Sequence, residues 1–318
     1  LTHLGLGTGL PPSMALATGD QDLPGVLVSG LEGQYGICEE HAGDLQKCFN
    51  LITMQEFLEN KTQLGPKTQA VYVWGGRPAV SQELRSPPCL KIVAGVGAGP
   101  DHLDPGLVAS FSVKAANTPH AVSNPTADLG MALLLAAARR VGESWKVNSH
   151  HLAISPHTEN FSTDWMARAF EMEILYHSRK RGSRATYCER LDDLLQRSDF
   201  VMLAVSLTPQ ARGLIGRREL SGMEPTAILS TSAAVRLLVG QDALVEALQT
   251  GVIKAAVLDV TYPEPLPRDH PLELKNVTLT PHIGSATHQA RRQTMENLVE
   301  SILASLNGLP IPNEVLFK

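Results

Sequence analysis

Acidic and imidazole side chains follow two successive strand-like runs near the end of the chain. Asp259 comes directly after the apolar run 255–258, Glu264 stands between two prolines, and His282 follows the run 277–280. A carboxylate beside a histidine holds one ring tautomer and stabilises the protonated ring, which makes a general acid able to protonate a carbonyl oxygen. The spacing alone fits equally well a solvent-exposed loop histidine beside a glutamate that is only a loop charge.

A glycine-rich turn follows another strand-like run at 90–94. Gly95, Gly97 and Gly99 alternate with small residues, but Pro100 stands near the place of the third glycine of a dinucleotide-binding turn. No acidic residue ends a second strand about 20 residues later, as that fingerprint requires. The exposed N–H groups of such a tight loop suit a small anion, such as a carboxylate.

Strand-like and helix-like segments alternate along the chain, which predicts an α/β fold with parallel sheets. The expected strands are 25–29, 71–74, 90–94, 174–176, 200–205, 227–229, 255–258 and 277–280. Helices are expected at 53–60, 129–140, 191–196, 241–250 and 290–307. We expect this second helix to begin at Pro125, before its apolar part 129–140, with Asn124 as its cap and Asp128 in its first turn. Ligands of open α/β sheets bind beyond the carboxyl ends of strands, where Asp259, Glu264 and His282 fall.

The bulk composition excludes several classes of protein. The chain has 318 residues, of which 43% are hydrophobic and 19% charged, with a net charge of -5, so we expect one large or two ordinary domains with real cores. The acidic balance argues against nucleic-acid and anionic-membrane partners, and no apolar run approaches the ~20 residues that span a bilayer. The scattered cysteines suit free thiols in the cytosol. Residues 1–13 lack the features of a secretion signal, and we read them as a translated or appended leader before Met14.

Six segments together carry a family resemblance. They are 90–94 (LKIVA), 101–104 (DHLD), 115–119 (AANTP), 206–209 (SLTP), 258–266 (LDVTYPEPL) and 280–287 (TPHIGSAT). From about residue 20 onward the chain resembles the D-isomer-specific 2-hydroxyacid dehydrogenases, most of all their glyoxylate/hydroxypyruvate reductase branch. The resemblance implies hydride transfer from nicotinamide to the carbonyl carbon of a small 2-oxo acid.

The resemblance also assigns roles to residues. His282 matches the proton donor and Glu264 its partner, and the amides of Ala98 and Gly99 match the loop that holds the substrate carboxylate. The remaining implied residues line the substrate and nicotinamide pocket or contact the cofactor: Asp259, Gly284, Ser285 and Ser206.

The end of the strand at 174–176 indicates which nicotinamide cofactor is preferred. An acidic residue there would bind a free ribose 2′-hydroxyl, whereas this chain has His177, Ser178, Arg179 and Lys180. Arg and Lys suit a 2′-phosphate, so NADP(H) is favoured over NAD(H). A solvated charge run is the alternative interpretation.

The family's nucleotide fold opens with a strand, a Gly-x-Gly-x-x-Gly turn and a helix, and this chain has no room for them. No glycine lies between Gly142 and Gly182, and Trp165 is followed almost at once by the strand at 174–176. A strand with its crossover needs a dozen or more further residues. We therefore expect a cofactor domain without its central strand and pyrophosphate cradle, and with exposed strand edges.

The arginine that grips the substrate carboxylate in this family is also displaced. It falls on Ala234 when counted forward from the strand at 227–229 and on Val235 when counted backward from 237–239, while the chain has its arginine at position 236. A one-residue shift in extended chain turns a side chain to the opposite face. Arg236 reaches the pocket only if the loop bulges.

Two hypotheses follow: a reductase with impaired activity, or a non-catalytic relative that is only a dimerising or inert protein. We predict a flavodoxin-like substrate domain (1–116 plus 290–318) and a truncated Rossmann-like domain (117–289) inserted in it. Family members are usually homodimers joined through the cofactor domain, which suits the apolar helix at 129–140. No metal site is expected, because His150, His151 and His157 read as exposed loop histidines.

Overall fold

The computed structural model describes residues 23–31, 39–75, 78–85, 87–97, 99, 103, 105–139, 171–178, 181, 185–204, 211–231 and 238–316. The contacts divide the chain into two compact units. Unit 1 consists of Leu1–Val122 and His288–Lys318, and unit 2 of Ser123–Thr287.

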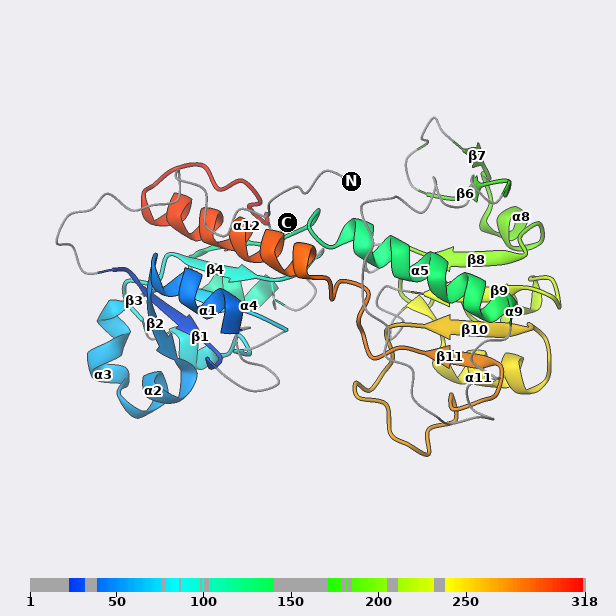
Figure 1. Cartoon of the computed structure of the whole chain (residues 1–318), viewed down its shortest axis with the longest axis horizontal. Coiled ribbons are helices and arrows are strands. Elements are labelled where there is room, and N and C mark those ends of the chain that lie inside the picture. Colours follow the sequence, from blue (N-terminus) through cyan, green and yellow to red (C-terminus); the bar gives the residue numbers. More distant parts are fainter. Residues whose placement is uncertain are drawn as a thin grey trace, which may run out of the picture. The chain divides into compact units, whose positions relative to one another are not determined.

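Unit 1 is built on a parallel five-stranded sheet in the order β2-β1-β3-β4-β5, a flavodoxin-like arrangement (Figure 1). Its strands are β1 (Gly25–Val28), β2 (Asn50–Thr53), β3 (Thr68–Val73), β4 (Ile92–Gly95) and β5 (Lys114–Ala116). Its helices are α1 (Glu39–Gln46), α2 (Met54–Glu59), α3 (Lys61–Leu64), α4 (Pro105–Ser110) and α12 (His288–Leu306), with 3₁₀ turns η2 (Gly65–Lys67) and η3 (Gln82–Arg85).

Successive residues of the unit 1 strands face two separate cores. On β1, Val26 and Val28 pack with Met295 and Leu298 of α12, whereas Leu27 packs in the opposite core, with Phe57 of α2. This alternation is the period-2 pattern of a strand buried on both faces. The chain therefore returns through α12 to complete the domain in which it began.

Unit 2 carries a parallel four-stranded sheet in the order β11-β10-β9-β8. These strands are β8 (Phe200–Leu203), β9 (Ile228–Thr231), β10 (Ala255–Leu258) and β11 (Val277–Leu279). Helix α5 (Ser123–Ala138) covers one face, where Leu133 packs with Ile228 and Val257. Leu244 of α11 (Gln241–Gln249) and Leu220 of α9 (Arg217–Ser221) pack in the core on the other face.

A second, separate sheet in unit 2 pairs β6 (Leu175–Tyr176) with β7 (Thr186–Tyr187), and α8 (Leu191–Leu195) follows it. Within the described part of the chain, no strand joins this pair to β8, so the two sheets are separate at that point. Rossmann-like sheets place their first strand between these two groups. The prediction that this first strand is missing concerns residues 140–170, which lie outside the described residues.

Most predicted elements match the structure to within one or two residues, but three strands and the helices α1, α3, α4 and α9 were missed, and one helix start was wrong. The missed strands are β2, β5 and β7, which are short or carry polar residues and give no apolar run. Helix α5 begins at Ser123, so Asn124 is not its cap and Asp128 lies beyond its first turn. Asp128 Oδ1 is buried without a hydrogen-bond partner, and burial raises the pKa of its carboxyl group.

The backbone of β8 indicates which groups face the unpaired edge. The Ile228 N–H donates to the Asp199 carbonyl (2.9 Å), and Phe200 is in register with Ile228. In a parallel ladder, alternate residues bond to one neighbour. Val201 therefore bonds to β9, while the N–H and C=O groups of Phe200 and Met202 point the other way.

We predict that the amides of Phe200 and Met202 exchange with deuterium at least about tenfold faster than that of Val201, since their N–H groups lack a strand partner. Strand β10 is the control, because neighbours on both sides should protect Ala256 and Val257 alike. Hydrogen exchange read residue by residue by NMR measures both. Equal protection along β8 would mean that a further strand pairs with its open edge.

Candidate active site

The buried carboxylate of Asp259 ties the end of β10 to the loop that follows β11. Its Oδ1 accepts from the Thr280 hydroxyl (2.6 Å) and the Ile283 N–H (2.9 Å), and its Oδ2 accepts from the Gly284 N–H (2.8 Å). The side chain is 1% exposed, so these bonds replace the water that an ionised carboxylate loses on burial. The loop is therefore fixed from inside the unit.

His282 lies at the tip of this loop in a left-handed backbone conformation, with φ at +53°. Its N–H donates to the carbonyls of Asp259 (2.9 Å) and Thr280 (3.0 Å). A non-glycine residue in this region is uncommon and persists only where surrounding contacts hold it. The bonds to Asp259 and Thr280 provide that restraint.

The imidazole of His282 meets the carboxylate of Glu264. Nδ1 lies 3.1 Å from Oε2, while the other carboxylate oxygen accepts from the Thr261 N–H at 3.0 Å. An ionised carboxylate only accepts hydrogen bonds, so Nδ1 carries the proton and Nε2 is left to exchange one. The side chains are 57% and 39% exposed, so the pair is open to a reactant. This arrangement can act as a general acid or base.

Gly284 is required by close packing against Asp259. A Cβ at this position would lie 2.8 Å from Asp259 Oδ2 and 3.3 Å from Thr126 Cγ2 of helix α5. The neighbouring Ser285 is half-buried, and its carbonyl accepts from the Thr287 N–H. The predicted residues Asp259, Glu264, His282, Gly284 and Ser285 therefore belong to one region of unit 2.

The predicted substrate loop lies in unit 1, after β4. The Gly97 N–H donates to the Thr118 hydroxyl (3.1 Å), and the Thr118 N–H donates to the Gly97 carbonyl (3.0 Å). Gly99 is half-buried, and Ala98 lies outside the described residues. Carboxylate binding by Ala98 and Gly99 stays a prediction.

The predicted cofactor residues His177 and Ser178 follow β6 and belong to a small aromatic cluster. His177 Nδ1 lies 3.0 Å from the Cys188 carbonyl, and the ring stacks on Tyr187, whose hydroxyl donates to the Ser178 carbonyl. Arg181 lies over the face of the same tyrosine ring. The predictions for Arg179, Lys180, Ser206 and Arg236 fall outside the described residues.

Several residues that shape the site gave little signal in the sequence. Thr280 could have been suspected, because a hydroxyl at a strand end commonly bonds to a neighbouring carboxylate. Thr126 and Thr261 offered no such sign, since their contacts depend on how distant segments pack. Among the described residues, no group of three or more His, Cys, Asp or Glu side chains could hold a metal ion, and no helix is long and apolar enough to cross a bilayer.

Comparisons with known proteins identify the family. The model described as "D-isomer specific 2-hydroxyacid dehydrogenase, NAD binding domain" matches residues 162–284. Glyoxylate/hydroxypyruvate reductase B of Erwinia tasmaniensis is 35% identical over 269 residues, covering 76% of this chain and 83% of the relative. Glyoxylate reductase of Thermococcus gammatolerans is 38% identical over 250 residues, covering 70% and 75%.

A solved structure has the same architecture. The NADPH-dependent glyoxylate/hydroxypyruvate reductase of Sinorhizobium meliloti, in complex with NADP and malonate, superposes with a TM-score of 0.76 at 25% identity, covering 92% of this chain and 96% of that one. The two-unit α/β fold is the fold of this NADPH-dependent reductase. The chain belongs to the D-isomer-specific 2-hydroxyacid dehydrogenase family.

The described part of unit 2 does not include the turn that would hold the pyrophosphate of a dinucleotide. The pyrophosphate of such a cofactor binds at a glycine-rich turn between the central strand and its helix. Among the described residues no strand occupies that central position, residues 140–170 lie outside them, and the sequence has no glycine between Gly142 and Gly182. We therefore derive no hydride-transfer step for this chain.

We predict that Gly284→Ala destabilises unit 2 by about 1–3 kcal/mol, because the new methyl group must displace either Asp259 or Thr126. Gly43→Ala in α1 is the matched control: a Cβ there has open space, and alanine favours the helix by about 0.5–1 kcal/mol. Thermal unfolding of both variants measures the difference. A Gly284→Ala protein that melts with the wild type would contradict the close packing.

Proposed function

We propose that this chain descends from NADP(H)-dependent glyoxylate/hydroxypyruvate reductases and keeps their proton-transfer pair, but that its reductase activity is impaired. The observation that carries the proposal is the coexistence of the His282–Glu264 pair with an interrupted cofactor sheet. The substrate would be a small 2-oxo acid, since both named relatives and the NADP complex belong to reductases of that kind.

The proton-transfer half of the site is supported by its geometry. Glu264 holds the tautomer of His282, and Asp259 holds the loop that carries the ring. In this proposal Nε2 of His282 would donate a proton to the oxygen of the 2-oxo group, and NADPH, where it binds, would supply the hydride to the carbonyl carbon. General acid catalysis of this type contributes typically about 10²–10⁴-fold to rate.

The cofactor half of the site supports only weak binding. Without amides at a helix N-terminus, the two pyrophosphate charges lose their strongest partners in the fold. Displacement of the family arginine to Arg236 would weaken the grip on the substrate carboxylate as well. The NADP(H) preference rests on Arg179 and Lys180, together with the NADP bound by the Sinorhizobium enzyme.

A second candidate function is that of a non-catalytic family member. The interrupted sheet favours it directly, since a chain that cannot bind the dinucleotide cannot transfer hydride. A homodimer formed through the α5 region is compatible with both candidates. A cytosolic location is also part of the proposal and suits the free thiols of Cys48, Cys89 and Cys188.

We predict that the purified, folded chain binds NADPH at least about a hundredfold more weakly than the Sinorhizobium reductase does in a parallel titration. That ratio corresponds to about 2.7 kcal/mol of lost pyrophosphate contacts. Calorimetry measures binding, and circular dichroism verifies folding. Micromolar binding would refute the impairment, whereas no binding at millimolar NADPH would leave only the non-catalytic candidate.

If binding is detected, hydroxypyruvate reduction by His282→Ala should fall about 10²–10⁴-fold below wild type, with NADPH affinity unchanged. Steady-state assays at saturating NADPH measure the rates. A His282→Ala protein as active as wild type would exclude His282 as the proton donor.

A further inference from the structure

Gln241, the first residue of helix α11, contacts the turn that carries Glu264. Its Nε2 donates to the carbonyl of Tyr262 at 2.8 Å. Tyr262 lies two residues before Glu264 in a turn closed by the bond from the Thr261 N–H to Glu264 and by the Thr261 hydroxyl, which donates to the Pro263 carbonyl. Because these two hydrogen bonds hold the turn together, the contact at Tyr262 also affects the position of Glu264.

Helix α11 is a firm support for this contact. Leu244 and Leu248 on the helix are 0% and 4% exposed and pack in the same core as Leu258 of β10. The Asp259 side chain, which follows Leu258, holds the His282 loop. Gln241 therefore links the Glu264 turn to the same packed core that fixes His282.

The ring of His270 lies against the same amide group of Gln241. Its Nδ1 accepts from the Leu272 N–H at 3.1 Å, and its Nε2 lies 3.1 Å from Gln241 Nε2. A neutral imidazole has one acceptor nitrogen. With Nδ1 as the acceptor, Nε2 carries a hydrogen and faces another donor, so the Gln241 amide serves Tyr262 in this arrangement.

The oxygen of the Gln241 amide shows that a hydrogen bond to His270 and a hydrogen bond to the Tyr262 carbonyl exclude each other. Gln241 Oε1 is buried and has no hydrogen-bond partner. If the amide were rotated, its oxygen would accept from His270 Nε2. The same oxygen would then lie against the Tyr262 carbonyl oxygen, and two acceptors repel each other. The orientation of one amide thus decides whether the Glu264 turn is held.

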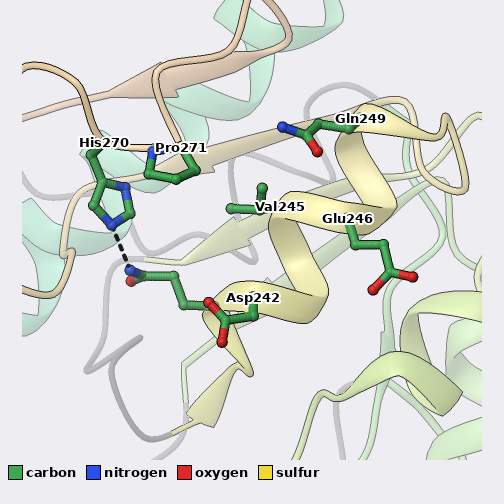
Figure 2. A pocket seen from close by; sticks show the side chains of 7 residues that line it. Asp242, Val245, Glu246, Gln249, His270 and Pro271 are labelled. Atoms are coloured by element: carbon green, nitrogen blue, oxygen red, sulfur yellow. Dashed lines mark hydrogen bonds between the residues drawn. The ribbon is translucent and has the colours of Figure 1, made fainter.

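A cavity of about 230 Å³ adjoins this contact (Figure 2). His270 and Pro271 line one side, and Asp242, Val245, Glu246 and Gln249 line the other, along α11. Gln241 lines the cavity as well, whereas the turn residues 261–264 do not.

We propose that Gln241 is a positioning residue: by holding the Tyr262 carbonyl, it keeps Glu264 against His282 and so fixes the tautomer of the His282 ring. The inference rests on the proposed role of the His282–Glu264 pair. It does not require that the chain bind NADPH, because the tautomer is a property of the free protein.

The test is the tautomer of His282 in Gln241→Met, which keeps the length of the side chain but removes its donor. Ring nitrogen NMR shifts of ¹⁵N-histidine-labelled protein, at a pH where the ring is neutral, report the ratio of Nδ1–H to Nε2–H forms. His282→Asn identifies the resonance. We expect Nδ1–H to dominate in the wild type and the ratio to fall at least about threefold in Gln241→Met, as the ring loses its carboxylate partner.

Three further variants separate positioning from general loosening of the loop. Gln249→Met alters another glutamine of α11 that lines the same cavity. His270→Asn keeps an oxygen for the Leu272 N–H and removes the ring nitrogen that faces Gln241. Both variants should keep the wild-type ratio of Nδ1–H to Nε2–H forms. Gln241→Lys, which retains a donor for Tyr262, should keep it too, and it gives an answer even if Gln241→Met does not fold. An unchanged ratio in folded Gln241→Met, a loss in Gln241→Lys, or an equal loss in His270→Asn would overturn the proposal. Failure to bind NADPH, by contrast, would weaken the proposed function and leave this result unaffected.

Discussion

The buried carboxylate of Asp259 is the interaction on which the site depends. An ionised carboxylate that is 1% exposed must find hydrogen-bond donors inside the protein, and here they are Thr280, Ile283 and Gly284. These hydrogen bonds hold the loop after β11 against the end of β10. His282 can then hold its left-handed backbone conformation, and a glycine is required at 284. The proton-transfer geometry is thus a consequence of satisfying one buried charge.

The two parts of unit 2 on either side of β8 differ in the helices and strands that their described residues form. The sheet from β8 to β11 has helices on both faces, buried strands and a fixed active-site loop. On the far side of β8, the described chain contains only the two-residue strands β6 and β7, paired with each other. The chemistry of proton transfer needs only the first part. Dinucleotide binding needs continuity between the two parts, so the proposed impairment concerns the cofactor and not the proton-transfer pair.

The sequence predicted the architecture because its buried strands are short apolar runs and its parallel sheets have cores on both faces. It placed Asp259, Glu264 and His282 together, since the carboxyl ends of adjacent parallel strands lie at one edge. The absence of the first cofactor strand stays a prediction, because it is counted from a deficit of residues in a segment, 140–170, that lies outside the described residues. Strands β2, β5 and β7 escaped because they bury too few apolar side chains to give a pattern. The partners Thr126 and Gln241 escaped for a different reason: their contacts are set by how α5 and α11 pack, which no local spacing encodes.

We propose that this chain keeps its proton-transfer pair and that its main defect is in holding the dinucleotide. The most direct measurement is a gain of function, made by replacing residues 140–170 with the corresponding strand–turn–helix segment of the Sinorhizobium reductase. NADPH affinity of the chimaera and of the parent is then compared by calorimetry. The account predicts at least about a hundredfold tighter binding in the chimaera. A parent chain that already binds NADPH as tightly as a folded chimaera would contradict it.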